Sequence, residues 1–119
     1  MEREEFEKLV ISALNDLPEE FQRRLENIDV VVEDEPSTDV LKERRIKPPS
    51  ILLGLYHGVP LNRRGRRYFN ILPDKITLYQ KPIESLCQNE YELKKRVREV
   101  IRHEIGHYFG LSEKELRGT

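Results

Sequence analysis

Apolar residues in the first part of the chain recur three and four positions apart, which is the period of an amphipathic helix. These positions are Phe6, Leu9, Val10, Ala13, Leu14 and Leu17. The segment "LPEEF" then places Pro18 in the first turn of a second helix, with Phe21 and Leu25 facing inward. The pattern therefore predicts two short helices at the start of the fold.

The next apolar run has no helical period. In "IDVVVEDE", β-branched residues crowd together before an acidic stretch and Pro36, a pattern that predicts a strand ending in a turn. Residues 36–49 are expected to form a surface loop. A second strand is predicted for "SILLGLYHG", where Gly54 interrupts the apolar run, and a polar loop follows it.

Two further stretches, "RYFNIL" and "KITLYQ", have the composition of paired strands. Because Pro73 and Asp74 separate them, we expect a hairpin, with Ile76 and Leu78 on one face of its second strand. Pro82 is expected to close the strand region. The strands of the fold are thus predicted to lie between helical segments.

The last predicted helix runs from about Glu90 to Phe109 and is stopped by Gly110, because glycine most easily takes the left-handed cap conformation. Its inward stripe consists of Leu93, Val97, Val100, Ile101 and Tyr108. At about 100° per residue, Glu104 falls in the middle of this stripe and His107 at its edge. Burying a carboxylate without a partner is costly, so this position predicts a nearby cation, a hydrogen-bond network or a water-filled cleft.

The composition fits one globular domain spanning residues 1–119. The chain is 37% hydrophobic and 36% charged with a formal net charge of −1, a balance that predicts neither a nucleic-acid nor a membrane partner. The acidic start "MEREEFEK" does not resemble a signal peptide, and no apolar run approaches the length of a transmembrane helix. Cys87, the single cysteine, has no partner for an internal disulfide, and we expect a cytoplasmic protein.

The segment "RHEIGH" contains the pattern His-Glu-x-x-His. Residues four apart on a helix lie one above the other, so His103 and His107 can both reach one metal ion, while Glu104 leans over the neighbouring space. A charged, solvated helix face does not explain the pattern, because the three residues lie on or beside the apolar stripe. The sequence therefore predicts a metal site.

A catalytic zinc normally takes three protein ligands, so a third is needed close to the helix end. Glu113 lies six positions after His107, beyond the turn expected at Gly110, and is the preferred candidate. Glu115 is the competitor, but with Ser112 it matches a capping box that would occupy its carboxylate. His57 remains a further alternative, since a lone histidine beside a glycine is also typical of a polar strand end.

The segment "HEIGHYFGLSE" resembles the zincin metallopeptidases. Together with "LLGLYHGVPL", "RRG" and "LPDKITLY", it is similar to the small bacterial minimal-zincin family. This resemblance implies an α+β fold with a small mixed sheet, helices on one side and the active-site helix near the C-terminus, under the sheet. It also implies one zinc ion per chain held by His103, His107 and Glu113, with Glu104 as the general base. Unlike the larger metzincin class, the chain has no third histidine at position 113 and no methionine downstream of the helix.

The implied function is zinc-dependent hydrolysis of peptide bonds in a peptide or protein substrate. The strand "ILLGLYHG" is a candidate edge for pairing with an extended peptide, and a core strand is the alternative. Because only twelve residues follow His107, we expect no far wall of a cleft and a shallow site. Such a site would take flexible peptides, borrow a wall from a second copy in a homo-oligomer, or turn over poorly.

Two alternative functions follow from other features. Four arginines in "NRRGRR", within residues 62–67, could bind phosphates, which would suit a zinc hydrolase acting on RNA. The overall charge and the lack of a run of aromatic residues disfavour this alternative. A zinc-stabilised interaction module without catalysis is the other. Tyr56, Tyr79 and Tyr108 are candidate donors to the oxyanion of a peptidase, although an inward tyrosine is typical of a core.

Overall fold

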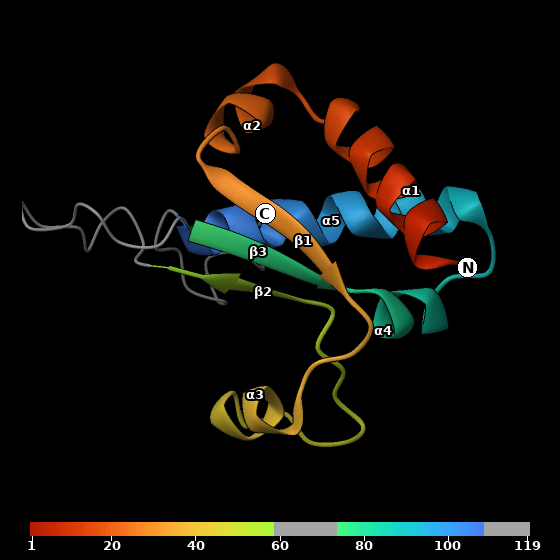
Figure 1. Cartoon of the computed structure of the whole chain (residues 1–119), viewed down its shortest axis with the longest axis vertical. Coiled ribbons are helices and arrows are strands. Elements are labelled where there is room, and N and C mark those ends of the chain that lie inside the picture. Colours follow the sequence, from red (N-terminus) through yellow and green to blue (C-terminus); the bar gives the residue numbers. More distant parts are fainter. Residues whose placement is uncertain (59–73, 109–119) are drawn as a thin grey trace, which may run out of the picture.

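The computed structural model describes residues 1–58 and 74–108. The elements in these ranges are α1 (Arg3–Asn15), α2 (Glu19–Arg24), β1 (Ile28–Glu33), α3 (Thr38–Glu43), β2 (Gly54–His57), β3 (Asp74–Tyr79), α4 (Gln80–Ser85) and α5 (Glu90–Tyr108) (Figure 1). The α+β class and the long helix near the C-terminus are confirmed. None of the helices in the described ranges combines the length and apolarity that crossing a membrane requires.

The described strands form a mixed sheet in the order β1-β3-β2. β1 runs parallel to β3, with Ile28 opposite Asp74, and β2 runs antiparallel to β3, with Gly54 opposite Leu78. Both edges of β3 are therefore occupied by strands that precede it by many residues. The hairpin predicted across Pro73 and Asp74 is wrong for this reason, and its first strand lies outside the described residues.

The core lies between the sheet and the helices α1 and α5, which pack against each other (Figure 1). Ile76 and Leu78 of β3 are fully buried in it. Because side chains alternate along a strand, Thr77 and Tyr79 belong to the opposite face, and they are buried as well. The resemblance implies helices on one side of the sheet. Helices α1 and α5 have this placement, whereas α3 lies apart from them (Figure 1).

Several local predictions need correction. The stretch 36–49 is not only a loop, because Ser37 caps α3 by accepting a hydrogen bond from the backbone N–H of Val40 at 3.1 Å. Only the second half of the predicted strand 50–58 is regular, beginning at Gly54. The last described strand ends at Tyr79, shortly before Pro82 as expected, but Pro82 lies inside a further helix, in the first turn of α4, where a missing N–H costs nothing.

The predicted amphipathic character of α5 is confirmed. Leu93, Val97, Val100 and Ile101 are buried, and Ile105 continues the stripe. Glu104 lies among them with only 7% of its surface exposed, as its helical position predicts. The side chain of Tyr108 lies outside the described part of the structure.

Gly54 allows β2 to approach α5 more closely than any other residue would. A Cβ atom at this position would lie 2.6 Å from Cγ1 of Val100 and 3.2 Å from the carbonyl oxygen of Thr77. We expect Gly54→Ala to lower the free energy of unfolding by about 1–3 kcal/mol, as overpacking commonly does. Urea unfolding measures this loss. When Val100 is also changed to Ala, the clash is relieved, so Gly54→Ala should cost less stability in the Val100→Ala background than in the parent. Equal stability of Gly54→Ala and the parent would contradict the close approach.

Candidate metal centre

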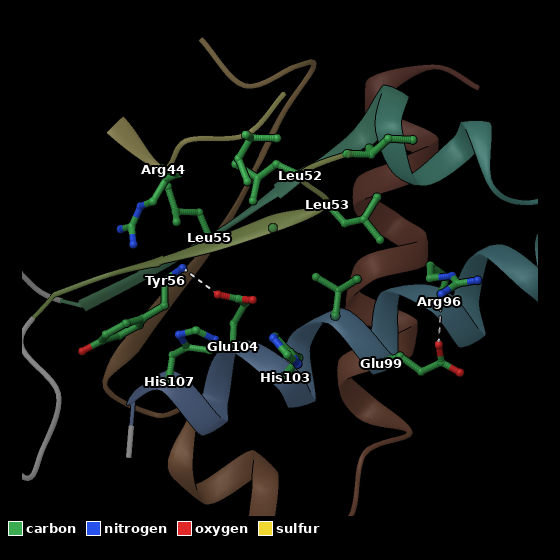
Figure 2. A pocket seen from close by; sticks show the side chains of 14 residues that line it. Arg44, Leu52, Leu53, Leu55, Tyr56, Arg96, Glu99, His103, Glu104 and His107 are labelled. Carbon is green, nitrogen blue, oxygen red and sulfur yellow. Dashed lines mark hydrogen bonds and ion pairs between the residues drawn. The ribbon is translucent and has the colours of Figure 1, made fainter. Parts of the chain in front are cut away.

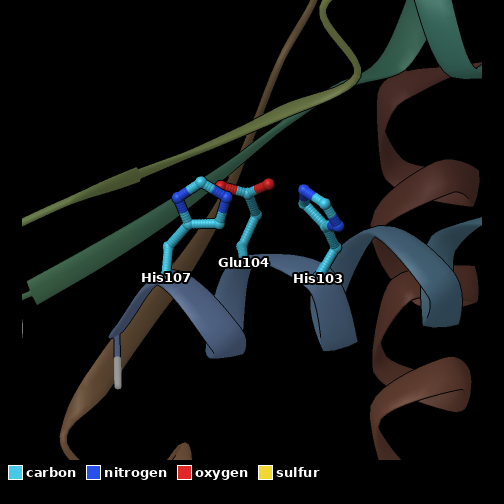
Figure 3. A group of neighbouring side chains, drawn as sticks. All are labelled: His103, Glu104 and His107. Atoms are coloured by element: carbon cyan, nitrogen blue, oxygen red, sulfur yellow. The ribbon is translucent and has the colours of Figure 1, made fainter. Parts of the chain in front are cut away.

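Three potential ligand side chains lie together on the last two turns of α5 (Figure 3). One ligand atom each from His103, Glu104 and His107 lies within 4.8 Å of the others. The two imidazole rings are 5.1 Å apart between centroids and inclined at 48°. Because His103 and His107 are four residues apart, the helix itself places them side by side. The predicted pair of histidines is therefore brought together on one face.

Glu104 reaches from α5 to strand β2. Its Oε1 atom accepts a hydrogen bond from the backbone N–H of Tyr56 at 2.9 Å. The sheet register explains why this N–H is available. Tyr79 donates its backbone N–H to the carbonyl of Leu53 at 3.0 Å, so Leu53 faces β3, and two residues on Leu55 does too. The backbone groups of Gly54 and Tyr56 then point away from β3, and Glu104 meets one of them. This bond supplies the hydrogen-bond partner that the buried carboxylate requires.

The side chain of Tyr56 is held by the first residue of β3, Asp74. Its hydroxyl donates a hydrogen bond to Oδ2 of Asp74 at 3.1 Å, and both residues are buried. Gly58 follows closely with φ of 147°, and a Cβ there would overlap the Asp74 carboxylate and the Tyr56 hydroxyl. The hydrogen bond between the Tyr56 hydroxyl and the Asp74 carboxylate therefore holds Tyr56 in place. The backbone N–H of the same residue is the one that binds Glu104.

The described part of the structure gives no support to the three tyrosines that the sequence offered as oxyanion donors. The hydroxyl proton of Tyr56 is directed at Asp74. Tyr79 is buried on the sheet face opposite the core and does not line the groove described below. Burial raises the pKa of the Tyr79 hydroxyl, and the charge of Glu33 raises it further. Tyr79 is thus a packed residue in this arrangement, and Tyr108 offers no described side chain.

A groove of about 690 Å³ is lined by His103, Glu104 and His107. Figure 2 shows that α5 forms its lower side and β2 its back, with Arg44, Leu52 and Leu55 on the upper side. Most of the apolar lining comes from residues that precede or belong to β2, namely Ile46, Ile51, Leu52, Leu53 and Leu55, and Val100 of α5 adds to it. The expectation of a shallow site without a far wall overlooked this segment, because only residues after His107 were considered.

Of the other residues predicted to bind metal or RNA, His57 lies in the described part of the structure and the rest lie outside it. His57 is an exposed residue of β2 and belongs neither to the described ligand group nor to the groove lining. Burial lowers the pKa of His57, and the positive charges of Lys75 and Arg44 lower it further. The third-ligand candidates Glu113 and Glu115 lie outside the described residues. The same holds for the arginines of the proposed RNA-binding loop, Arg63, Arg64, Arg66 and Arg67.

Sequence reasoning missed the backbone partner of Glu104 and the upper wall of the groove. The contact between Tyr56 and Glu104 joins residues 48 positions apart, so no local pattern contains it. The wall around Arg44 follows a helix whose start was marked by Ser37, since serine is a preferred residue at the position before a helix. That capping residue was the signal that could have revealed α3.

Comparisons with known proteins identify a family and a protein of similar structure. The family model of zincin-like metallopeptidases matches residues 25–119. A solved structure of a conserved hypothetical protein from Thermus thermophilus is similar to the chain with a TM-score of 0.59 and 25% sequence identity. The match covers 92% of this chain and 94% of that one. The curated proteins yield no match. The matched range includes His103, Glu104 and His107, and all three strands of the described sheet.

Proposed function

Because the chain belongs to the family of zincin-like metallopeptidases, we propose that it hydrolyses peptide bonds with the help of one zinc ion. The observation that carries the proposal is the group formed by His103, Glu104 and His107, which lines the groove. Two imidazoles four residues apart on a helix supply two of the three protein ligands of a catalytic zinc site, and the carboxylate between them is placed as its general base.

The residues present fit a zinc ion. In a tetrahedral site with Zn–N distances of about 2.0–2.1 Å, two histidine nitrogens lie roughly 3.4 Å apart. Small side-chain rotations can bring His103 and His107 to this separation, since their ligand atoms already lie within 4.8 Å of each other. We propose Glu113 as the third protein ligand, with Glu115 as the alternative.

When bound, zinc would polarise the scissile carbonyl and lower the pKa of a coordinated water. Glu104 is proposed to act as the general base, because its carboxylate can accept a proton from the attacking water and pass it to the leaving amine. The hydrogen bond from Tyr56 engages Oε1, and Oε2 is the atom proposed for this task. The bond also fixes the orientation of the carboxylate, so the base does not have to be ordered during the reaction.

Strand β2 is proposed to bind the substrate backbone. In the described part of the chain, β3 is the strand that pairs with β2, and the other edge of β2 carries the backbone groups of Gly54. An extended peptide can add to such an edge. On α5 the groove spans Arg96 to His107, which is about 17 Å and the length of roughly five extended residues. A peptide segment is therefore a substrate of suitable size.

A zinc-stabilised interaction module is the second candidate function. The contact between Glu104 and Tyr56 favours it, because the contact also gives Glu104 a structural role in joining α5 to β2. In such a module the metal would stabilise the fold and no bond would be cleaved.

Metal analysis combined with peptide-library cleavage tests the proposal. We expect about one zinc ion per chain and cleavage that a chelator stops and added zinc restores. Bound zinc together with unfolding on chelation, and no cleavage of any library member, would instead support the interaction module. A chain without zinc that still cleaves peptides would refute the metal centre.

A further inference from the structure

Arg44 lies at the end of α3, in a turn that directs it to the groove. The backbone N–H of Ile46 donates to the carbonyl of Leu41 at 2.9 Å, and that of Arg45 donates to the carbonyl of Lys42 at 3.1 Å. This is the hydrogen-bond pattern of a Schellman turn, with Arg45 in the left-handed conformation at φ 56°. The backbone of a residue other than glycine is strained in this conformation. The strained residue separates Arg44 and Ile46, which both line the groove.

The guanidinium of Arg44 differs from the other groove arginine in its ion pairing among the described residues. Within residues 1–58 and 74–108 it makes no ion pair and no side-chain hydrogen bond. Arg96, the other arginine of the groove, differs because it pairs with Glu99 at 3.5 Å. Figure 2 shows the two at opposite ends, with Arg44 above Leu55 at the end that holds Tyr56 and Glu104. Among the described residues, the groove arginine without an ion-pair partner is thus the one at the end that holds Glu104.

Charge interactions agree with this placement. Arg44 and Glu104 act in opposite directions on the pKa of Tyr79, after the larger effects of burial and Glu33, so both charges lie within electrostatic range of the same phenol. Lys75 and Arg44 both lower the pKa of His57, after the larger effect of burial. Lys75 thus adds a second positive charge to this region, and Glu33 and Glu43, which raise the pKa of His57, add negative charge to it. An anion in direct contact with the guanidinium of Arg44 would still be attracted most strongly by that nearest charge.

We propose that Arg44 is a specificity-determining residue that binds a carboxylate of the substrate close to the scissile bond, an inference that rests on the proposed peptidase function. Guanidinium and carboxylate groups match in geometry and form paired, charge-assisted hydrogen bonds. The surrounding wall of Ile46, Leu52 and Leu55 lowers the local polarity and so strengthens the attraction. The carboxylate can belong to an aspartate or glutamate side chain or to the C-terminus of the peptide.

Matched peptides test the proposal and separate the two sources of the carboxylate. One set replaces Glu by Gln at each position of a labelled peptide, and a second compares a free C-terminal acid with its amide. Binding is measured by fluorescence anisotropy with the zinc-loaded Glu104→Gln variant, so that no peptide is cleaved, and kcat/KM is measured with the parent. We expect about fivefold preference for the acid within about two residues of the cleaved bond, in one set or in both.

Substitutions assign the preference to Arg44. Arg44→Gln should remove it, because kcat/KM should fall about fivefold more for the acidic peptide than for its neutral counterpart, and Arg44→Glu should favour lysine-containing peptides instead. Lys47→Gln is the control for loss of an exposed charge in the same segment, and Arg96→Gln is the control for the far end of the groove. Both should keep the preference.

The outcomes separate this proposal from the peptidase itself. Cleavage that depends on Glu104 but shows no acid preference, or a preference that disappears in Arg96→Gln and persists in Arg44→Gln, would overturn the role of Arg44 and leave the peptidase standing. Absence of measurable binding to any acidic peptide would also overturn it. Acid preference in binding that requires Arg44, without any cleavage by the parent, would keep the carboxylate site and refute the peptidase.

Discussion

Glu104→Gln is expected to lower kcat/KM for peptide hydrolysis roughly a thousandfold while the zinc content stays at about one per chain. The amide cannot take up the proton of the attacking water. Its carbonyl oxygen can still accept the hydrogen bond that Tyr56 donates to Oε1 at 2.9 Å, so the contact between α5 and β2 is retained. Activity, metal content and the urea midpoint are measured on the same preparation.

Glu99→Gln is the matched control for this substitution. Glu99 lies on the same helix and lines the same groove, but it is exposed and pairs with Arg96. The loss of one carboxylate at position 99 should leave kcat/KM within a few-fold of the parent. If Glu104→Gln hydrolysed peptides at the parent rate, the general-base assignment would be wrong whatever the metal content.

His103→Ala should lower zinc affinity by more than the roughly 10–100-fold that loss of a residue supporting a ligand costs. His103 is half-buried at the helix surface, so the fold of the metal-free chain should persist. Competition with a chromophoric chelator measures the affinity. Activity should disappear at zinc concentrations that saturate the parent and return in part at higher zinc.

The same titration distinguishes the two candidates for the third ligand. Glu113→Gln should weaken zinc binding strongly, whereas Glu115→Gln should leave it close to the parent because Glu115 is expected to cap a helical turn. A reversed result would assign the third ligand to Glu115. Zinc binding unaffected by either change would place the remaining ligand elsewhere in the chain.

The sequence was most informative where a single helix determines the geometry. Every residue of α5 has a fixed angular position, so the burial of Glu104 and the pairing of His103 with His107 follow from their numbers alone. The strand at Ile28–Glu33 could likewise be predicted, because its β-branched residues have a strong local preference.

Strand order was not accessible in this way. Pro73 and Asp74 gave a local signal for a hairpin, but β3 is paired along both edges with β1 and β2, and such pairing depends on the whole fold. The groove was missed for a related reason. Its upper wall comes from Arg44, Ile46 and residues 51–53, which are distant in sequence from the histidines and contain no recognisable motif.

The central position of β3 has a consequence for the order in which the protein becomes functional. On a ribosome, β1 and β2 emerge before the strand that joins them, and α5 is the last of the described elements to emerge. A nascent chain shorter than about 79 residues therefore lacks the partner that both strands need, and the groove cannot form before α5 docks. The proposed peptide-cleaving activity would thereby be confined to chains that have been synthesised past the catalytic helix, and incomplete chains could not digest themselves or their neighbours.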